Sequence, residues 1–259
     1  MNRFLKSLEL SITERCNRKC CFCPHGVGFQ PNISDMTIET AESIANSLKD
    51  MNFCYRLGLS GRGEPLLHPN ILDMVKTLRK GLSGHYTFEI ITNGDMLNQG
   101  LILDLLRLGI TKIIVSMHDG EHQIPYFNNM FKSIRSDSFV LRNHWDKSQI
   151  SLNNRCGDAY KNDSEIHRVC YIPFYKGLIR ENGDVGLCCQ DWKNVVRAGN
   201  INDGNLSDIW LSDTLNMYRK RLVSGDRGSS PCNSCDIQGD LRGEDSFRGF
   251  VYEFEKNNR

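Results

Sequence analysis

The first part of the chain alternates between short apolar runs and longer amphipathic segments. Strands are predicted where apolar residues cluster or alternate over about four to eight positions, and helices where they recur every three or four. The predicted strands are residues 8–13, 55–60, 87–91 and 111–116. Helical spacing follows at residues 41–48, 71–79 and 101–108, and Ser34 and Thr37 are candidate caps of the first helix. Strands that alternate with helices predict βαβ units and a parallel sheet.

Polar or conformationally special residues follow each predicted strand. They are Cys16, Cys20 and Cys23 after the first strand, Gly63, Glu64 and Pro65 after the second, Asn93 after the third, and Ser116 and His118 at the fourth. The active sites of (β/α) barrels are built at these strand ends. The four or five units before residue 155 are too few for a closed eight-fold barrel. We therefore expect an α/β fold with a partial (β/α) barrel, since no G-x-G-x-x-G motif supports a Rossmann sheet.

A polar, less regular stretch at residues 143–162 predicts a junction, so we expect domains at residues 1–150 and 151–259. Beyond the junction, Asn182-Gly183 lies between two apolar runs, which is a strong β-hairpin signal. A helix is predicted from about residue 205 to about residue 222, with Leu206, Ile209 and Trp210 on one face. The predicted C-terminal domain is a small β-hairpin-plus-helix unit.

Composition changes this picture little. The chain has 259 residues, of which 39% are hydrophobic and 24% charged, as in ordinary globular proteins. Its formal net charge of +1 gives no global field for a polyanion, so no nucleic-acid partner is expected. The N-terminus lacks a signal-peptide pattern, and no apolar run approaches the roughly 18 residues that span a bilayer. We expect a cytoplasmic protein without a membrane partner.

The eleven cysteines change the picture most. Cytosolic cysteines more often bind metal or perform redox chemistry than form disulfides. Cys16, Cys20 and Cys23 are spaced C-x3-C-x2-C, whereas zinc sites usually combine pairs into four ligands. Three thiolates on one short loop suit a four-iron cluster with one open iron. A zinc loop, or three unrelated structural thiols, is the alternative.

A second group of cysteines lies near the C-terminus. Its four members are Cys170, Cys188, Cys232 and Cys235, which suit either a structural zinc ion or a second cluster. Cys189 adjoins a ligand position and is a candidate alternative ligand or cavity-wall residue. The remaining cysteines are expected to be small packing residues, namely Cys21, Cys54 and Cys156.

The first group, with Phe22 directly before Cys23, resembles the C-x3-C-x-aromatic-C signature of the radical S-adenosylmethionine (SAM) superfamily. The resemblance implies a [4Fe–4S] cluster whose open iron is chelated by SAM. It also implies that Gly63, Glu64 and Pro65 form the Gly-Glu-Pro motif, in which the glutamate meets the SAM amino group. By the same resemblance, Phe22 packs near the cluster and adenine. The strand-end residues Asn93, Ser116 and His118 would contact SAM or substrate.

The second group resembles the twitch (SPASM-like) auxiliary-cluster domains of that superfamily. The shared features are C-x12-G-x4-C from Cys170 to Cys188, a Gly-Asn-Ile segment at 199–201 and the following helix. Because no cysteine follows Cys235, the resemblance implies one auxiliary [4Fe–4S] cluster, and hence two clusters in all. The chain also resembles the twitch-type dehydrogenases of antibiotic (aminoglycoside) biosynthesis.

The resemblance to these dehydrogenases implies oxidation of a secondary alcohol of an aminocyclitol or sugar-type small molecule to a ketone. It implies a one-electron donor such as flavodoxin or ferredoxin, and a catalytic position for Arg155 in Asn154-Arg155-Cys156-Gly157. An arginine is a poor general base at neutral pH, so anchoring of the substrate is its safer role.

Several positions leave the substrate open. Arg62 adjoins the Gly-Glu-Pro motif, and Gln190 directly follows Cys188 and Cys189. An anionic or neutral substrate therefore fits as well as an amine. Asp95 and Asp191 remain as carboxylates for an amine. The enzyme alternatives are modification of a ribosomally made peptide, for which no N-terminal binding domain is expected, and a molybdenum-cofactor-type cyclase, whose diglycine ending is absent. A zinc-binding interaction module is the non-enzyme alternative.

Overall fold

Eight strands form one open sheet in the order β5-β4-β3-β2-β1-β6-β7-β8. The structure is a computed structural model that describes residues 4–146, 153–159, 169–237 and 241–257. The strands are β1 Ser7–Leu10, β2 Arg56–Leu59, β3 Thr87–Thr92, β4 Lys112–Met117, β5 Phe139–Asn143, β6 Lys176–Ile179, β7 Asp184–Gly186 and β8 Arg197–Asn200. Strands β1 to β6 pair in parallel, and β7 and β8 are antiparallel additions. This open, mostly parallel sheet confirms the predicted partial barrel.

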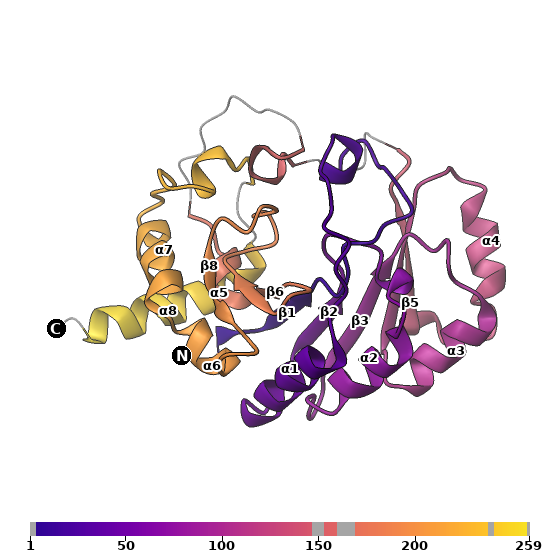
Figure 1. Cartoon of the computed structure of the whole chain (residues 1–259), viewed down its shortest axis with the longest axis horizontal. Helices are drawn as coiled ribbons and strands as arrows, with labels where there is room; N and C mark the ends of the chain where they lie inside the picture. Colours follow the sequence, from indigo (N-terminus) through magenta and orange to yellow (C-terminus); the bar gives the residue numbers. More distant parts are fainter. Residues whose placement is uncertain (1–3, 147–152, 160–168, 238–240, 258–259) are drawn as a thin grey trace.

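Helices α1 to α4 alternate with the first five strands, and the others belong to the C-terminal part of the chain (Figure 1). Their bounds are α1 Ile38–Asp50, α2 Ile71–Arg79, α3 Gln99–Arg107, α4 Gln123–Met130, α5 Ile172–Tyr175, α6 Leu206–Trp210, α7 Asp213–Val223 and α8 Glu244–Asn257. The predicted cap Thr37 does begin α1, and its hydroxyl accepts a hydrogen bond from the Thr40 amide at 3.2 Å. The sequence analysis located no residues for α4, β5 or α8. Among the described residues, no helix combines the length and the apolar character needed to cross a membrane.

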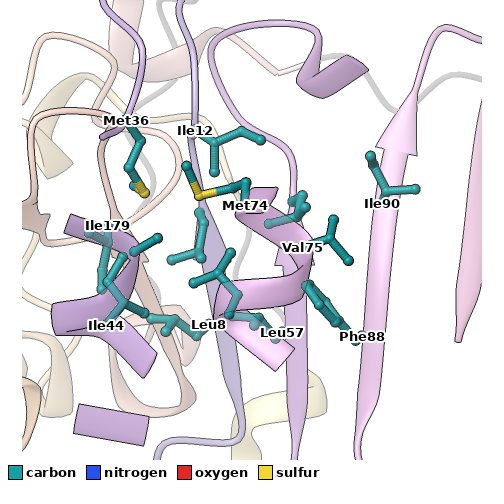
Figure 2. Close-up of a cluster of buried hydrophobic side chains, with 14 of the residues drawn as sticks. Leu8, Ile12, Met36, Ile44, Leu57, Met74, Val75, Phe88, Ile90 and Ile179 are labelled. Carbon is teal, nitrogen blue, oxygen red and sulfur yellow. The ribbon is translucent and has the colours of Figure 1, made fainter. Parts of the chain in front are cut away.

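Apolar side chains at alternate strand positions fill the space between the sheet and its helices. Leu8, Leu57 and Phe88 are register partners on β1, β2 and β3, and all three are fully buried. Figure 2 shows them beside Ile44 of α1 and Met74 of α2. Because successive strand residues point to opposite faces, the residues between them point to the other side of the sheet.

The opposite face carries charged and polar side chains. Arg56 donates to the Ser7 hydroxyl at 2.8 Å and forms an ion pair with Glu89 on the neighbouring strand. Lys176 of β6 lies 2.5 Å from the Glu9 carboxylate of β1. One face of the sheet therefore packs into the hydrophobic core, and the other face is polar and can carry a site.

The predicted hairpin is present and extends the barrel sheet. Strands β6 and β7 pair antiparallel around Asn182-Gly183, where Gly183 has φ +87° and a Cβ would lie 2.6 Å from the Asn202 amide. Strand β6 also pairs in parallel with β1, with Ser7 opposite Lys176. The sheet thus runs across residue 150, and the division into domains 1–150 and 151–259 stays a prediction.

The continuous helix expected at residues 205–222 is wrong, because the chain breaks between α6 and α7. Ser212 is extended (φ −57°, ψ 152°), and its hydroxyl accepts the Leu215 amide at 3.4 Å as the N-cap of α7. Arg219 of α7 donates to the Trp210 carbonyl at 2.6 Å. A helix end leaves carbonyls without intrahelical partners, so this bond stabilises the break. Helical periodicity continues across the break, and the sequence pattern therefore conceals it.

Candidate active site and its two cysteine clusters

The cysteine loop after β1 places three thiols on the wall of one cavity. Cys16, Cys20 and Cys23 line this cavity of about 340 Å³, which is called the first cavity below. The loop is tight, since the Cys23 amide donates to the Cys20 carbonyl at 2.9 Å and a Cβ at Gly26 would lie 2.2 Å from the same oxygen. Burial raises the pKa of all three thiols, that of Cys20 to about 11. Iron binding must therefore displace protons, and three thiolates facing a cavity fit a cluster with one open iron.

Glu64 is buried in another wall of the first cavity. The residue is 3% exposed, and its carboxylate accepts the Asn93 amide at 2.7 Å and the Leu66 amide at 3.1 Å. Burial raises its pKa, because a low-dielectric environment disfavours the ionised form. A ligand ammonium would offset that cost, so the site fits the role that the Gly-Glu-Pro resemblance implies.

The neighbours of Glu64 join the motif to the cysteine loop. A Cβ at Gly63 would lie 2.4 Å from the Thr13 carbonyl oxygen, so only glycine fits this close approach. The Glu64 amide donates to the Arg15 carbonyl at 2.7 Å. Pro65 is buried behind the carboxylate as the first residue of the 3-10 turn Pro65–Leu67. Gly63 and Glu64 line the first cavity, and Pro65 is not among its lining residues.

A neutral aromatic surface lies beside the thiols. Phe22 stacks on His118 with ring centroids 5.8 Å apart, and His144 contacts His118 edge-on at 5.4 Å. Desolvation lowers the pKa of His118 to about 4, so its imidazole is neutral at neutral pH. These rings and Ser116 all line the first cavity, where they can pack against an aromatic ligand group. The sequence analysis singled out Phe22, Ser116 and His118, but not His144.

Polar contacts bind the cysteine loop to the ends of β3 and β4. The Asn93 side chain lines the first cavity and donates to Asn17 at 2.8 Å. Arg18 donates to Asp95 and to Asp119, each at 2.7 Å. The predicted Asn93 therefore positions the loop, and Arg18, which was not predicted, does the same. A cation inside a cysteine loop was the signal that could have identified it.

A second cavity collects the C-terminal cysteines. The predicted ligands Cys170, Cys188, Cys232 and Cys235 all line it, together with Cys156. Cys156 thus adjoins the predicted ligands, a position that its predicted packing role did not include. In the part of the chain that the structure describes, no three His, Cys, Asp or Glu side chains are close enough to hold a single metal ion. Thiols gathered around one cavity suit the two groups considered for them, a structural zinc ion or a second cluster.

Two short segments form the wall between the cavities. Arg155 lines the first cavity, and the next residue, Cys156, lines the second. Likewise, Cys188 lines the second cavity, and the next residue, Cys189, lines the first. At both places the two sites are separated by adjacent residues of one chain segment. The sequence analysis did not predict this arrangement.

The segment that carries Arg155 is held in an unusual conformation. Arg155 and Cys156 have φ values of +49° and +56°, a region that non-glycine residues rarely occupy. Asn154 fixes the segment, because its side chain donates to the Ser234 carbonyl at 2.7 Å and its amide donates to the Asp236 carboxylate at 2.9 Å. The loop of the last two cysteines therefore positions Arg155.

Charged residues of the sheet's polar face also line the first cavity. They include Glu9 of β1, Arg142 of β5, Lys176 of β6 and Arg180 directly after β6. Burial raises the pKa of Glu9, but Lys176 overcomes this effect, and the net shift lowers the pKa. The sequence analysis missed all four. Their alternation with apolar strand residues was the available signal, since it marks the second face of the sheet.

Two family descriptions match separate parts of the chain. The radical SAM superfamily matches residues 10–142, more than half of the 259 residues, and an iron–sulfur cluster-binding domain (SPASM) matches residues 170–236. The first match contains Cys16, Cys20, Cys23 and Glu64, and the second contains the four predicted cysteines of the second cavity. The two matches imply SAM, a [4Fe–4S] cluster and further iron–sulfur binding for this chain, and the assignment of individual side chains to them stays a prediction.

Relatives align with most of the chain. The S-adenosyl-L-methionine-dependent 2-deoxy-scyllo-inosamine dehydrogenase of Niallia circulans is 29% identical over 92% of this chain and 96% of its own. The GTP 3′,8-cyclase of Aquifex aeolicus is 32% identical over 98% of this chain and 72% of its own. The crystal structure of BtrN in complex with AdoMet and 2-DOIA has a TM-score of 0.78 at 27% identity, over 92% of this chain and 95% of that one.

Proposed function

Because the chain belongs to the radical SAM superfamily, we propose that it is a dehydrogenase that oxidises a secondary alcohol of an aminocyclitol or sugar-type substrate to a ketone. The Niallia dehydrogenase supports this, since it aligns over nearly the full length of both chains. The observation that carries the proposal is the shared wall at Arg155–Cys156 and Cys188–Cys189. A two-electron oxidation of one bound substrate needs both sites within reach.

The residues of the first cavity hold the cofactors and orient them. The cluster would be bound by Cys16, Cys20 and Cys23. The Glu64 carboxylate would accept a charge-assisted hydrogen bond from the SAM ammonium. When bound there, SAM and the cluster would supply the radical chemistry that removes a hydrogen atom from a substrate carbon. Phe22 packs beside the cluster and the adenine ring.

Formation of the ketone also removes a proton and a second electron. An arginine is a hydrogen-bond donor and a poor general base, so Arg155 anchors the carbinol oxygen while the proton passes to water. The cysteines of the second cavity would hold an auxiliary cluster able to accept that electron, and the wall at Cys188–Cys189 separates it from the substrate. A one-electron donor such as flavodoxin or ferredoxin supplies the first cluster, and a reducing cytoplasm suits both clusters.

The deciding experiment is an anaerobic assay of the reconstituted enzyme with carbon-deuterated aminocyclitols and sugars. We expect deuterium in 5′-deoxyadenosine and one equivalent of ketone for each SAM cleaved. Zinc without iron after reconstitution, or a crosslinked peptide in place of a ketone, would contradict the proposal.

The second candidate is GTP cyclisation, which the identity with the Aquifex cyclase favours. The same assay with GTP separates the two reactions. Consumption of GTP with formation of a cyclised nucleotide would replace the dehydrogenase proposal, whereas ketone formation from an alcohol without GTP turnover would support it.

A further inference from the structure

Both carboxylates that line the first cavity already have binding partners. Glu9 is paired with Lys176 at 2.5 Å, and Glu64 accepts two backbone amides and is assigned to SAM. Asp95, which the sequence analysis kept available for an amine, is bound by the side chain of Arg18. Asp191, the other candidate, is 1% exposed and accepts two backbone amides of its own loop at 2.9 Å. Among the described residues, no cavity carboxylate remains for a substrate ammonium.

Cationic side chains, in contrast, exceed carboxylates in the first cavity. Those with a carboxylate partner are Arg18, Arg62 and Lys176. Arg142, Arg155 and Arg180 also line the cavity, and within the described ranges they form no ion pair at 4.0 Å or less. Three arginines of the cavity thus have no carboxylate partner among the described residues.

Arg62 and Arg180 line the same cavity, and Glu181, the residue after Arg180, lies 3.9 Å from Arg62. Arg180 is 2% exposed, and the Arg62 side chain is 11% exposed. The Nε atoms of both are buried without a hydrogen-bond partner among the described residues. Burial and the nearby charge of Arg62 lower the pKa of Arg180 to about 10. A buried donor without an acceptor is costly, so an acceptor on a ligand would stabilise this pair.

The surroundings of the pair do not supply that acceptor. Arg62 forms an ion pair with Glu14 at 2.5 Å through Nη1, which leaves its Nε free. Glu181 lies 3.9 Å from Arg62, beyond hydrogen-bond distance, and burial raises its pKa towards the neutral form. Arg180 donates through Nη2 to the Asp191 carbonyl. An arginine matches the two oxygens of a phosphate or carboxylate through its planar set of donors.

On the basis of the proposed dehydrogenase function, we propose that the alcohol substrate carries a phosphate or carboxylate group that binds at Arg62 and Arg180. Arg155 then remains available for the carbinol oxygen. This arrangement separates an anion-binding end of the first cavity from the reacting carbon. It also gives the ion pair between Lys176 and Glu9 a role, since an unpaired carboxylate there would repel an anionic substrate.

The test compares ligands of one ring size on the reconstituted holoenzyme with SAM bound. The probes are glucose, glucose 6-phosphate, glucuronate and glucosamine, and binding is measured anaerobically by calorimetry. We expect both anions to bind about ten-fold or more tightly than glucose, and glucosamine to bind no better than glucose. Equal binding of all four, or tightest binding of glucosamine, would overturn the inference.

Variants locate the anion. Arg62→Gln and Arg180→Gln should each weaken glucose 6-phosphate binding about ten-fold and leave glucose binding unchanged. Arg135→Gln, on an exposed arginine outside the cavity, is the matched control. Iron content and SAM cleavage check that each variant is folded. The comparison of the four probes on the unmodified enzyme tests the inference even if a variant does not fold.

Two further outcomes separate this inference from the proposed function. GTP serves as a fifth probe, and if it binds more tightly than glucose 6-phosphate, the anion site stands but belongs to a nucleotide. Tight anion binding without ketone formation from any alcohol likewise supports the anion site and contradicts the dehydrogenase. Oxidation of an amine-bearing alcohol at high affinity would support the dehydrogenase and contradict the anion site.

Discussion

At the scale of single residues, Glu64 is positioned before any ligand binds. Its carboxylate is held by two backbone amides at 2.7 and 3.1 Å, and burial raises its pKa. The close approach at Gly63 fixes the backbone that carries it. A buried, oriented carboxylate that has no cationic partner among the described residues fits an ammonium better than a solvated glutamate would.

Glu64→Gln should therefore weaken SAM binding by about ten-fold or more, because the ammonium loses a charge-assisted partner. SAM affinity should also fall as pH decreases through the raised pKa of Glu64, since protonation removes the negative charge. Equilibrium binding of SAM between pH 5 and 8 measures both effects. The exposed Glu39→Gln is the control, and an unchanged affinity for Glu64→Gln would refute the assignment.

Cys156 raises a different question at this scale, because five thiols line a cavity for which four ligands were predicted. We expect Cys235→Ser to lower the iron content from about eight to about four per chain. Cys156→Ser should retain the iron and change the electron paramagnetic resonance signal of the auxiliary cluster, because it alters a polar side chain beside the ligands. Loss of about four irons from Cys156→Ser would make Cys156 a ligand instead.

At the scale of elements, the decisive junction is the parallel pairing of β1 with β6. It joins the C-terminal hairpin to the barrel and brings Lys176 opposite the polar face of β1. Lys176 and Glu9 are both nearly buried, and their ion pair lies 2.5 Å apart. A buried ion pair is sensitive to the loss of one partner, because the other charge is then left uncompensated.

Lys176→Met should lower the free energy of unfolding by about 3–5 kcal/mol at pH 7, because Glu9 is left charged and buried. Adding Glu9→Gln should restore much of that loss. The lowered pKa of Glu9 contributes stability above the ordinary glutamate pKa of about 4.3, and this contribution is lost as pH falls through the lower, folded-state value.

In Lys176→Met the sign reverses, since burial alone raises the pKa of Glu9. The deficit of the variant should therefore shrink as pH falls. Urea unfolding of the reconstituted proteins, followed by circular dichroism between pH 4 and 7, measures both slopes. A deficit independent of pH would mean that packing, and not charge, dominates this junction.

At the scale of the whole molecule, two cysteine sites share a wall built from distant parts of the chain. The Arg155 segment precedes β6, and the Cys188 segment follows β7, yet both separate the same two cavities. Figure 1 shows the C-terminal elements lying against the barrel on the β1 side. The arrangement predicts that the two sites cooperate in turnover but contribute to different steps.

Cys16→Ala should abolish SAM cleavage, because the first cluster loses a ligand. Cys170→Ala should retain part of the cleavage but form little ketone, because the second electron has no acceptor. Cys54→Ala, on a half-buried cysteine that lines neither cavity, is the control. The measurement is 5′-deoxyadenosine and ketone in the same reaction, and equal loss of both in Cys170→Ala would contradict an acceptor role.

The sequence by itself determined the first four strands and first three helices of the barrel, the hairpin at Asn182-Gly183 and the two sets of cysteines. These features depend on local periodicity, turn chemistry and residue spacing, which are properties of neighbouring residues. Tertiary structure alone decided the pairing of β1 with β6, the break before α7 and the wall between the cavities. It also decided that Arg62 and Arg180 line the same cavity. Each of these depends on contacts between residues far apart in the chain, and a single sequence does not record such contacts.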